Sequence, residues 1–423
     1  MESTVAQFSQ MAHGLVGSEI IKLAGEVKKK IAAGEHIYNF TIGDFNPHVF
    51  PIPEGWKSAI QKAYQEDYTN YPMANGMPEL RESVSKYLKE FGNLDYSADD
   101  ILVSSGSRPL IYATYRALID PEDTVLYPAP SWNNNHYSHL NSCKSVIIET
   151  HPEDNFMPSA AAIREHISNA TMLALCSPLN PTGTTFSKEA LREICEVVLE
   201  ENRKRAGNRK PVYLMYDSVY WMITHGETEH WNPVHLYPEM REYTITIDGM
   251  SKAFAGTGVR VGWVYGPSEL IGRMKAILSH MGAWSPKAEQ VASGNYLSNL
   301  DQVKKDSDRL NEEFAYRLNG IYNGLINLKN QGMPIDVIAP QAAIYLTVRF
   351  DLIGKTKPDG STIDSVEDIT SYLLNEAKVA LVPFYCFGAP RTSKWYRLSI
   401  GTAKREDVQG SVDSIKKALE KLT

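Results

Sequence analysis

Features that would direct this chain to a membrane, to nucleic acid or to secretion are scarce. No run of about 18 apolar residues occurs, so no segment is predicted to cross a membrane. The 43 basic residues are outnumbered by 50 acidic ones and form no basic block, which argues against nucleic-acid or anionic-membrane binding. The N-terminal stretch lacks the charged start and apolar core of a secretion signal. We therefore expect a soluble, cytoplasmic protein.

Metal-binding and disulfide patterns are also missing. The four cysteines show neither CxxC nor metal-ligand spacing, as is typical of reduced thiols. His225 and His230 lack the helical spacing of a zinc site. We expect no metal.

A series of short apolar stretches fills the middle of the chain. At 423 residues the chain is long enough for two domains with room to bury a ligand. Seven apolar stretches alternate there with helical spans, which predicts an α/β fold with a seven-stranded, mainly parallel sheet covered on both faces. The predicted strands are 101–104, 124–127, 145–149, 171–176, 212–216, 244–247 and 261–265.

The pattern differs at both ends of the chain. A helix is expected over 20–31, with Ser18 as its cap. Apolar residues at helical spacing from Leu310 to Leu325 predict a long helix that joins two domains. Beyond it the pattern is α+β, with strands at 343–349, 379–383 and 395–400 and a closing helix. We predict a large domain at 49–305 and a smaller α+β domain built from 1–48 and 306–423.

Lys252 lies in a tight turn between two apolar strands. An ammonium in such a place loses water, which lowers its pKa and makes the amine a nucleophile of the kind that forms Schiff bases. Eight residues later, Arg260 offers a guanidinium fork suited to a phosphate. A lysine that bonds an aldehyde and an arginine that holds a phosphate together fit pyridoxal 5′-phosphate (PLP). A surface lysine and an ordinary ion pair are the alternative.

Other polar residues follow the predicted strands, where parallel sheets bind their ligands. Gly106 and Pro109 predict a helix that begins at Pro109, with free amides at Ser107 and Arg108 that could hold an anion. A plain strand–helix turn is equally compatible with these four residues.

Two charged residues sit on strands that otherwise carry apolar side chains. Asp217 ends an apolar strand, where a buried carboxylate needs a cation such as a protonated pyridine nitrogen. Arg397 alternates with apolar neighbours and needs an anion, for which a structural salt bridge is the alternative. Asn180 lies in a loop fixed by two prolines and a glycine, so its amide is held rigidly.

The segments that contain these residues resemble the fold-type I PLP enzymes, specifically the class I/II aminotransferases, over about residues 18–420. The matching motifs are Ser251-Lys252, Gly258-Val259-Arg260-Val261-Gly262-Trp263, Asn180-Pro181-Thr182-Gly183, Asp217 and Arg397-Leu398-Ser399. The resemblance implies an aspartate aminotransferase-like enzyme with PLP as cofactor. It implies transfer of an amino group from an L-amino acid to a 2-oxo acid, and a homodimer with shared active sites.

The resemblance also assigns roles to individual residues. Lys252 would bond the cofactor and move the substrate's α-proton, with Asp217 and Tyr220 as its catalytic partners. Tyr71 would reach the cofactor phosphate of the partner subunit. The implied cofactor contacts are Tyr71, Ser107, Arg108, Trp132, Asn180, Asp217, Tyr220, Ser251, Lys252 and Arg260, and the implied contacts to the substrate carboxylate are Gly43 and Arg397.

Three questions stay open at this point. Arg108 could hold the phosphate or the side-chain carboxylate of an acidic substrate; we favour a dicarboxylate donor with 2-oxoglutarate as acceptor. Phe384 and Tyr385 replace the Pro-Gly usual in relatives and would narrow the substrate pocket. A PLP-dependent β-lyase or decarboxylase, or a ligand-binding protein without activity, could use the same scaffold.

Overall fold

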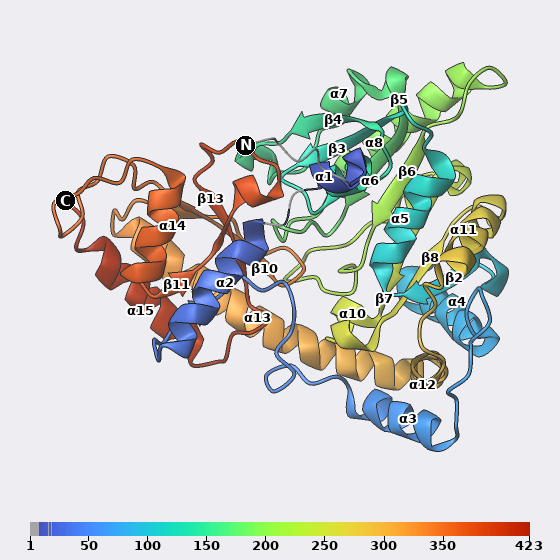
Figure 1. Cartoon of the computed structure of the whole chain (residues 1–423), viewed down its shortest axis with the longest axis horizontal. Coiled ribbons are helices and arrows are strands. Elements are labelled where there is room, and N and C mark those ends of the chain that lie inside the picture. The colour runs from blue at the N-terminus through green and yellow to red at the C-terminus, as the bar shows by residue number, and fades with distance from the viewer. Residues whose placement is uncertain (1–7, 16, 18) are drawn as a thin grey trace.

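A seven-stranded sheet forms the centre of the larger lobe (Figure 1). The computed structural model describes residues 8–15, 17 and 19–423. Its strand order is β2-β8-β7-β6-β5-β3-β4, with β8 antiparallel to β2 and β7 and the other pairings parallel. The strands are β2 (Ile101–Ser105), β3 (Thr124–Ala129), β4 (Lys144–Glu149), β5 (Ala170–Cys176), β6 (Tyr213–Asp217), β7 (Thr244–Gly249) and β8 (Val261–Tyr265). All seven predicted strands are confirmed.

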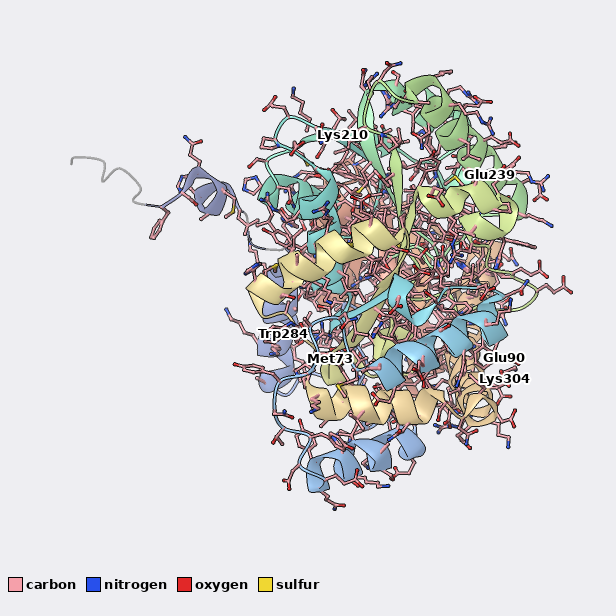
Figure 2. All side chains as sticks on the ribbon, turned by 90° about the vertical axis from the view of Figure 1, so that its right-hand side faces the viewer. Met73, Glu90, Lys210, Glu239, Trp284 and Lys304 are labelled. Atoms are coloured by element: carbon pink, nitrogen blue, oxygen red, sulfur yellow. The ribbon has the colours of Figure 1, made fainter. Side chains whose placement is uncertain are left out.

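Helices cover both faces of this sheet, because alternate residues of each strand point to opposite sides. Val103 and Trp263 pack in the core beneath α4 and α12, whereas Leu102 and Val264 pack beneath α5 and α11. Figure 2 shows the charged side chains of Lys210 and Glu239 at the periphery of the molecule. The helices of this lobe are α3 (Glu54–Gln65), α4 (Pro78–Gly92), α5 (Ser107–Leu118), α6 (Asn134–Leu140), α7 (Ala160–Arg164), α8 (Lys188–Arg205), α9 (Pro233–Leu236), α10 (Met250–Ala253), α11 (Ser268–Met281) and α12 (Lys287–Leu297).

A long helix, α13 (Leu300–Asn330), runs from the larger lobe into the smaller one (Figure 1). Its first turn packs on the core beneath α12, and the apolar residues from Leu310 to Leu325 pack in the core of the smaller lobe. The predicted helix is thereby confirmed. The predicted domain boundary at residue 305 falls within α13, so the helix belongs to both lobes.

The smaller lobe is α+β. Its four-stranded sheet has the order β12-β13-β10-β9, and a separate parallel pair joins β1 to β11. The predicted strand 379–383 is two short strands in different sheets, with Pro383 at a sheet edge where its missing N–H is tolerated. The elements of the smaller lobe are α2 (Glu19–Ala32), β1 (Tyr38–Asn39), β9 (Ile335–Val337), β10 (Tyr345–Phe350), α14 (Val366–Asn375), β11 (Val379–Ala380), β12 (Val382–Pro383), β13 (Trp395–Ser399) and α15 (Asp407–Leu419). The short helix α1 (Gln10–Gly14) lies instead beside α6 of the larger lobe (Figure 1), where the Met11 oxygen is 2.7 Å from His139 Nε2.

Two expectations concern the chain's N-terminal part. The expected cap Ser18 and residues 1–7 of the predicted small domain lie outside the described residues.

Across the part of the chain that the structure describes, no helix combines the length and apolarity needed to cross a membrane.

Candidate active site

A cavity of about 690 Å³ opens at the carboxyl ends of the large sheet's parallel strands. Residues from both lobes line it, including Gly43 and Arg397 from the smaller lobe's side and Asp217 and Lys252 from the large sheet. Every predicted site residue except Tyr71 lines this cavity. Segments far apart in the sequence therefore meet at one place, as expected for a sheet of this topology.

Lys252 sits in α10, the single helical turn that follows β7. Its Nζ donates a hydrogen bond to the backbone oxygen of Gly43 at 2.7 Å. Burial lowers the pKa of Lys252 to about 8, and the positive charges of Arg397 and Arg108 add to that effect while Asp44 opposes it. The neutral amine, which a nucleophile or a base requires, is thus the main form above about pH 8.

An anion cradle forms where β2 ends. The helix α5 begins at Ser107 with Gly106 as its N-cap, so the prediction that it begins at Pro109 was wrong. Proline is accepted inside the first turn because no intrahelical hydrogen bond needs its N–H there. The free amides of Ser107 and Arg108 remain at the helix N-terminus, as predicted.

Arg260 closes this cradle from the other side. Its Nη1 donates to the Thr257 oxygen at 2.6 Å and its Nη2 to the Ser105 oxygen at 2.9 Å. The guanidinium packs directly on Gly106, where φ is +84° and a Cβ would overlap Arg260. Only glycine fits this position, and it brings the arginine against the start of α5.

Asp217 is the last residue of β6, Tyr220 follows this strand, and both line the cavity. Burial raises the pKa of Asp217 to about 6, while the N–H of Val219, donating at 3.3 Å, and Lys252 hold it down. The Tyr220 hydroxyl hydrogen-bonds the hydroxyl of Tyr345, which comes from β10. These groups place a carboxylate and a phenol from the large lobe close to Lys252.

Arg397 is a buried cation, 2% exposed. Its Nη1 donates to Asn180 Oδ1 at 3.0 Å and its Nη2 to the Thr41 oxygen at 2.7 Å, whereas the buried Nε has no partner. Among the described residues no Asp or Glu lies within ion-pair distance of it, which removes the salt-bridge alternative there. A buried guanidinium in this state requires an anion from outside the chain.

Arg108 and Trp132 form the wall beside the cradle. The Arg108 guanidinium lies over the Trp132 ring, 4.5 Å from its centre, a cation–π contact. Ser251, next to Lys252, also lines the cavity.

Residues 35–415 match the family described as aminotransferase class I and II. The chain belongs to this family. It is 29% identical over 410 residues to an aspartate aminotransferase of Rhizobium meliloti (strain 1021), covering 96% of this chain and 92% of that protein. It is 30% identical over 391 residues to a probable aspartate/prephenate aminotransferase of Rickettsia felis, covering 92% and 90% of the two chains. The crystal structure of the Rhizobium meliloti aspartate aminotransferase has a TM-score of 0.88 at 27% identity, covering 99% of this chain and all of that one.

The chain is therefore an aminotransferase, an enzyme that transfers amino groups. The alternative of a ligand-binding protein without activity is set aside. The aminotransferase site contains residues that the sequence did not single out. Asp44 and Thr257 line the cavity and hydrogen-bond each other. Tyr345 supports Tyr220, and Ile20 of α2 contributes an apolar wall. Asp44 follows Gly43 directly and could have been found, whereas Ile20 reads as an ordinary apolar position of a helix.

Tyr71 lies outside the cavity. It is 83% exposed and packs edge-to-face on Trp284, with ring centres 5.2 Å apart. Its predicted service to a partner subunit stays a prediction.

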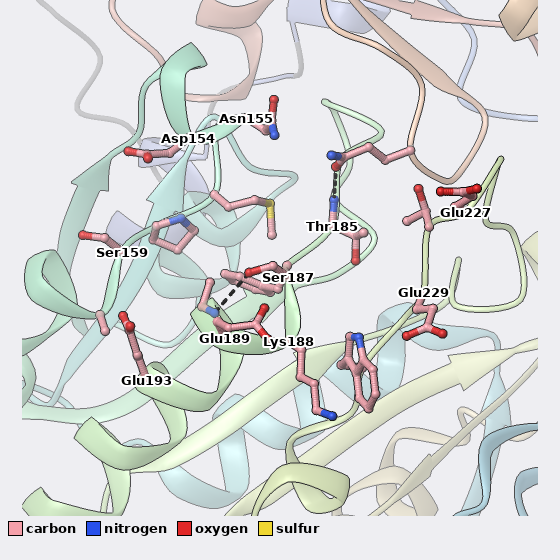
Figure 3. A pocket seen from close by; sticks show the side chains of 18 residues that line it. Asp154, Asn155, Ser159, Thr185, Ser187, Lys188, Glu189, Glu193, Glu227 and Glu229 are labelled. Atoms are coloured by element: carbon pink, nitrogen blue, oxygen red, sulfur yellow. Dashed lines mark hydrogen bonds between the residues drawn. The ribbon is translucent and has the colours of Figure 1, made fainter.

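A second cavity of the aminotransferase, about 730 Å³, lies apart from these residues (Figure 3). Figure 3 shows carboxylates of Asp154, Glu189, Glu193, Glu227 and Glu229 around it. The cavity's lysine, Lys188, makes a cation–π contact with Trp231, with its Nζ 4.4 Å from the ring centre. No arginine lines it among the described residues, so it offers little to an anionic cofactor or substrate.

Proposed function

We propose that this aminotransferase uses PLP bound to Lys252 to move an amino group from an L-amino acid to a 2-oxo acid. One observation carries the proposal: a partly buried lysine of lowered pKa and a buried arginine without a carboxylate partner among the described residues line the same cavity. The lysine suits an aldehyde and the arginine suits a carboxylate.

The donor set of the cavity fits PLP. Arg260, Arg108 and the amide of Ser107 would hold the phosphate at the start of α5. Asp217 would pair with the pyridine nitrogen, since its partly buried carboxylate lacks a cation within ion-pair distance among the described residues. Asn180 keeps its Nδ2 donor free because Arg397 occupies its oxygen. That donor and the Tyr220 hydroxyl would serve the phenolic oxygen, and Trp132 would face the ring. When bound, PLP supplies an electron sink for bonds at the substrate's α-carbon.

The chain's own residues then position the substrate and move its proton. Arg397 would hold the α-carboxylate, and Gly43 leaves space for it, because a Cβ there would lie 3.3 Å from Arg397 Nη1. Lys252 Nζ, neutral above a pKa of about 8, would take the α-proton and return it. Ile20 and Ala24 of α2 line the cavity with apolar side chains and would limit the access of water.

We favour a dicarboxylate donor, aspartate or glutamate, with 2-oxoglutarate as acceptor. Relatives named aspartate aminotransferase support this choice. Arg108 is the candidate for the side-chain carboxylate, because it is exposed and has no carboxylate within ion-pair distance among the described residues. We further propose a cytoplasmic homodimer in which Tyr71 serves the neighbouring site; the four free cysteines suit a reducing compartment.

A screen of amino donors against 2-oxoglutarate and pyruvate, with ammonia measured in parallel, tests the proposal. We expect the purified protein to be yellow and to form the product amino acid without releasing ammonia. Lys252→Ala should lose the yellow colour of the lysine-bound cofactor and should lose activity. Stoichiometric ammonia would instead indicate a lyase. A colourless protein that does not bind added PLP would contradict the proposal.

A further inference from the structure

Asp248 is a buried carboxyl that does not line the active-site cavity. It lies near the end of β7, is 1% exposed, and accepts two hydrogen bonds. The N–H of Gly249 donates to Oδ1 at 2.7 Å, and the indole Nε1 of Trp221 donates to Oδ2 at 2.8 Å. Its two oxygens are thus held by two different segments of the chain.

Both of those segments carry active-site residues. Gly249 is the N-cap of α10, the turn that contains Lys252. Trp221 follows Tyr220 directly, and its ring packs on Tyr87 with centres 5.5 Å apart. Gly249 cannot move freely, because it lies against Gly262, whose Cα would be 2.8 Å from a Cβ at position 249. The Asp248 carboxyl therefore joins the Lys252 turn to the Tyr220 segment.

The surroundings of Asp248 disfavour the ionised form of its carboxyl group. Among the described residues no Lys, Arg or His lies within ion-pair distance of it, and the titratable groups that face it are Asp217 of β6, Tyr265 of β8 and Tyr87 of α4. Burial raises the pKa of Asp248 to about 7, and the charge of Asp217 adds to the rise. An apolar residue of similar size at this position would stabilise the folded protein more than the buried carboxyl does.

We propose that Asp248 is a positioning residue of the aminotransferase reaction, which fixes the Lys252 turn relative to the Tyr220 segment. This inference rests on the proposed function, in which Lys252 bonds PLP and Tyr220 contacts it. Asp248 touches neither substrate nor cofactor and acts through those two residues. Its ionised form also adds negative charge behind the site, which favours cationic groups there.

Three variants test this role. Asp248→Asn keeps the shape and one acceptor oxygen but removes the charge, and Trp221→Phe removes only the indole donor. Asp306→Asn is the matched control: Asp306 is also buried, 8% exposed, and accepts hydrogen bonds from Tyr296 and Gln302, both at 3.1 Å. For each protein we would measure the pH midpoint of the visible band of the PLP-loaded enzyme, the Kd for PLP of the apoprotein, and the Tm.

We expect Asp248→Asn to lower the pH midpoint by about half a unit and to weaken PLP binding about tenfold. Trp221→Phe should shift both in the same direction by less, because loss of its donor raises the pKa of Asp248 and reduces the ionised fraction. Asp306→Asn should lower only the Tm.

Asp248→Asn with a wild-type midpoint and PLP affinity would overturn the inference, even if its Tm fell. Should Asp248→Asn not fold, an unchanged midpoint and Kd in Trp221→Phe would overturn it equally. A wild-type protein that does not bind PLP would overturn the proposed function itself, which is a distinguishable result.

Discussion

At the scale of single residues, the site is marked by cations that lack anions. Lys252, Arg108, Arg260 and Arg397 line one cavity, and among the described residues none has a carboxylate within ion-pair distance. Such a cluster is unfavourable in the empty protein and becomes favourable when a phosphate and a carboxylate bind.

Lys252 should therefore cost the apoprotein stability in a pH-dependent way. Its folded pKa of about 8 lies below its ordinary value of 10.5, so the unfolded chain keeps its proton more tightly. The penalty is complete below about pH 8 and disappears as the pH rises towards 10.5. We expect apo Lys252→Met to be about 2 kcal/mol more stable than the wild type near neutral pH. Urea denaturation near pH 7 and near pH 10 checks this; an equal difference at both would contradict it.

The role of Arg108 can be separated from that of the general carboxylate site. Arg397→Ala should lower kcat/KM for every donor, because all amino acids present the same carboxylate. The expected loss of transition-state stabilisation is about 2–5 kcal/mol. Arg108→Met should lower kcat/KM for aspartate and glutamate well below that for leucine or phenylalanine. The measurement is kcat/KM for the four donors in each variant. An equal fall for all donors with Arg108→Met would place Arg108 in the phosphate cradle alone.

At the scale of elements, the sequence predicts what depends on local pattern and misses what depends on distant contact. All seven strands of the large sheet follow from short apolar stretches bounded by turn residues. The start of α5 was misplaced because Pro109 is acceptable at more than one position of a first turn. The pairing of Tyr220 with Tyr345 joins residues 125 positions apart, and no local pattern reports such a contact. Asp217, Lys252 and the start of α5 need no long-range knowledge beyond the sheet's topology, because each lies at or just after the carboxyl end of a strand of the large sheet.

The loop between β2 and α5 depends on glycine at position 106. Gly106→Ala would place a methyl group against the Arg260 guanidinium at a φ of +84°, so the cradle must open. We expect a loss of stability of about 1–3 kcal/mol and clearly weaker PLP binding. Gly207→Ala is the control, because Gly207 also has a positive φ, +77°, but a Cβ there meets nothing within 4 Å. Calorimetry and PLP titration of both variants check this; equal effects would show that the close approach at Gly106 is unimportant.

At the scale of the whole molecule, two segments of the large lobe leave apolar side chains uncovered. Residues 64–73 pack against residues 281–289 through the Tyr71–Trp284 contact and a hydrogen bond from Lys287 to Asn70. Tyr64, Tyr71, Met73 and Met281 are exposed on these segments, and Figure 2 labels Met73 and Trp284 there. An exposed apolar patch of this kind suits a protein–protein interface, and a second copy of the chain is the occupant that the proposed homodimer requires.

Complementation between two defective variants tests whether Tyr71 acts across that interface. If each site combines Lys252 of one subunit with Tyr71 of the other, Lys252→Ala and Tyr71→Ala homodimers are each defective at both sites. In a mixed dimer of the two variants, one site receives both defects and the other receives none. Random reassociation of equal amounts should thus restore about a quarter of the wild-type sites. Specific activity after co-refolding measures this, with unmixed variants as controls. If Tyr71 served its own subunit, both sites of the mixed dimer would keep a defect and no activity would return, and a monomer with full activity would contradict the shared site outright.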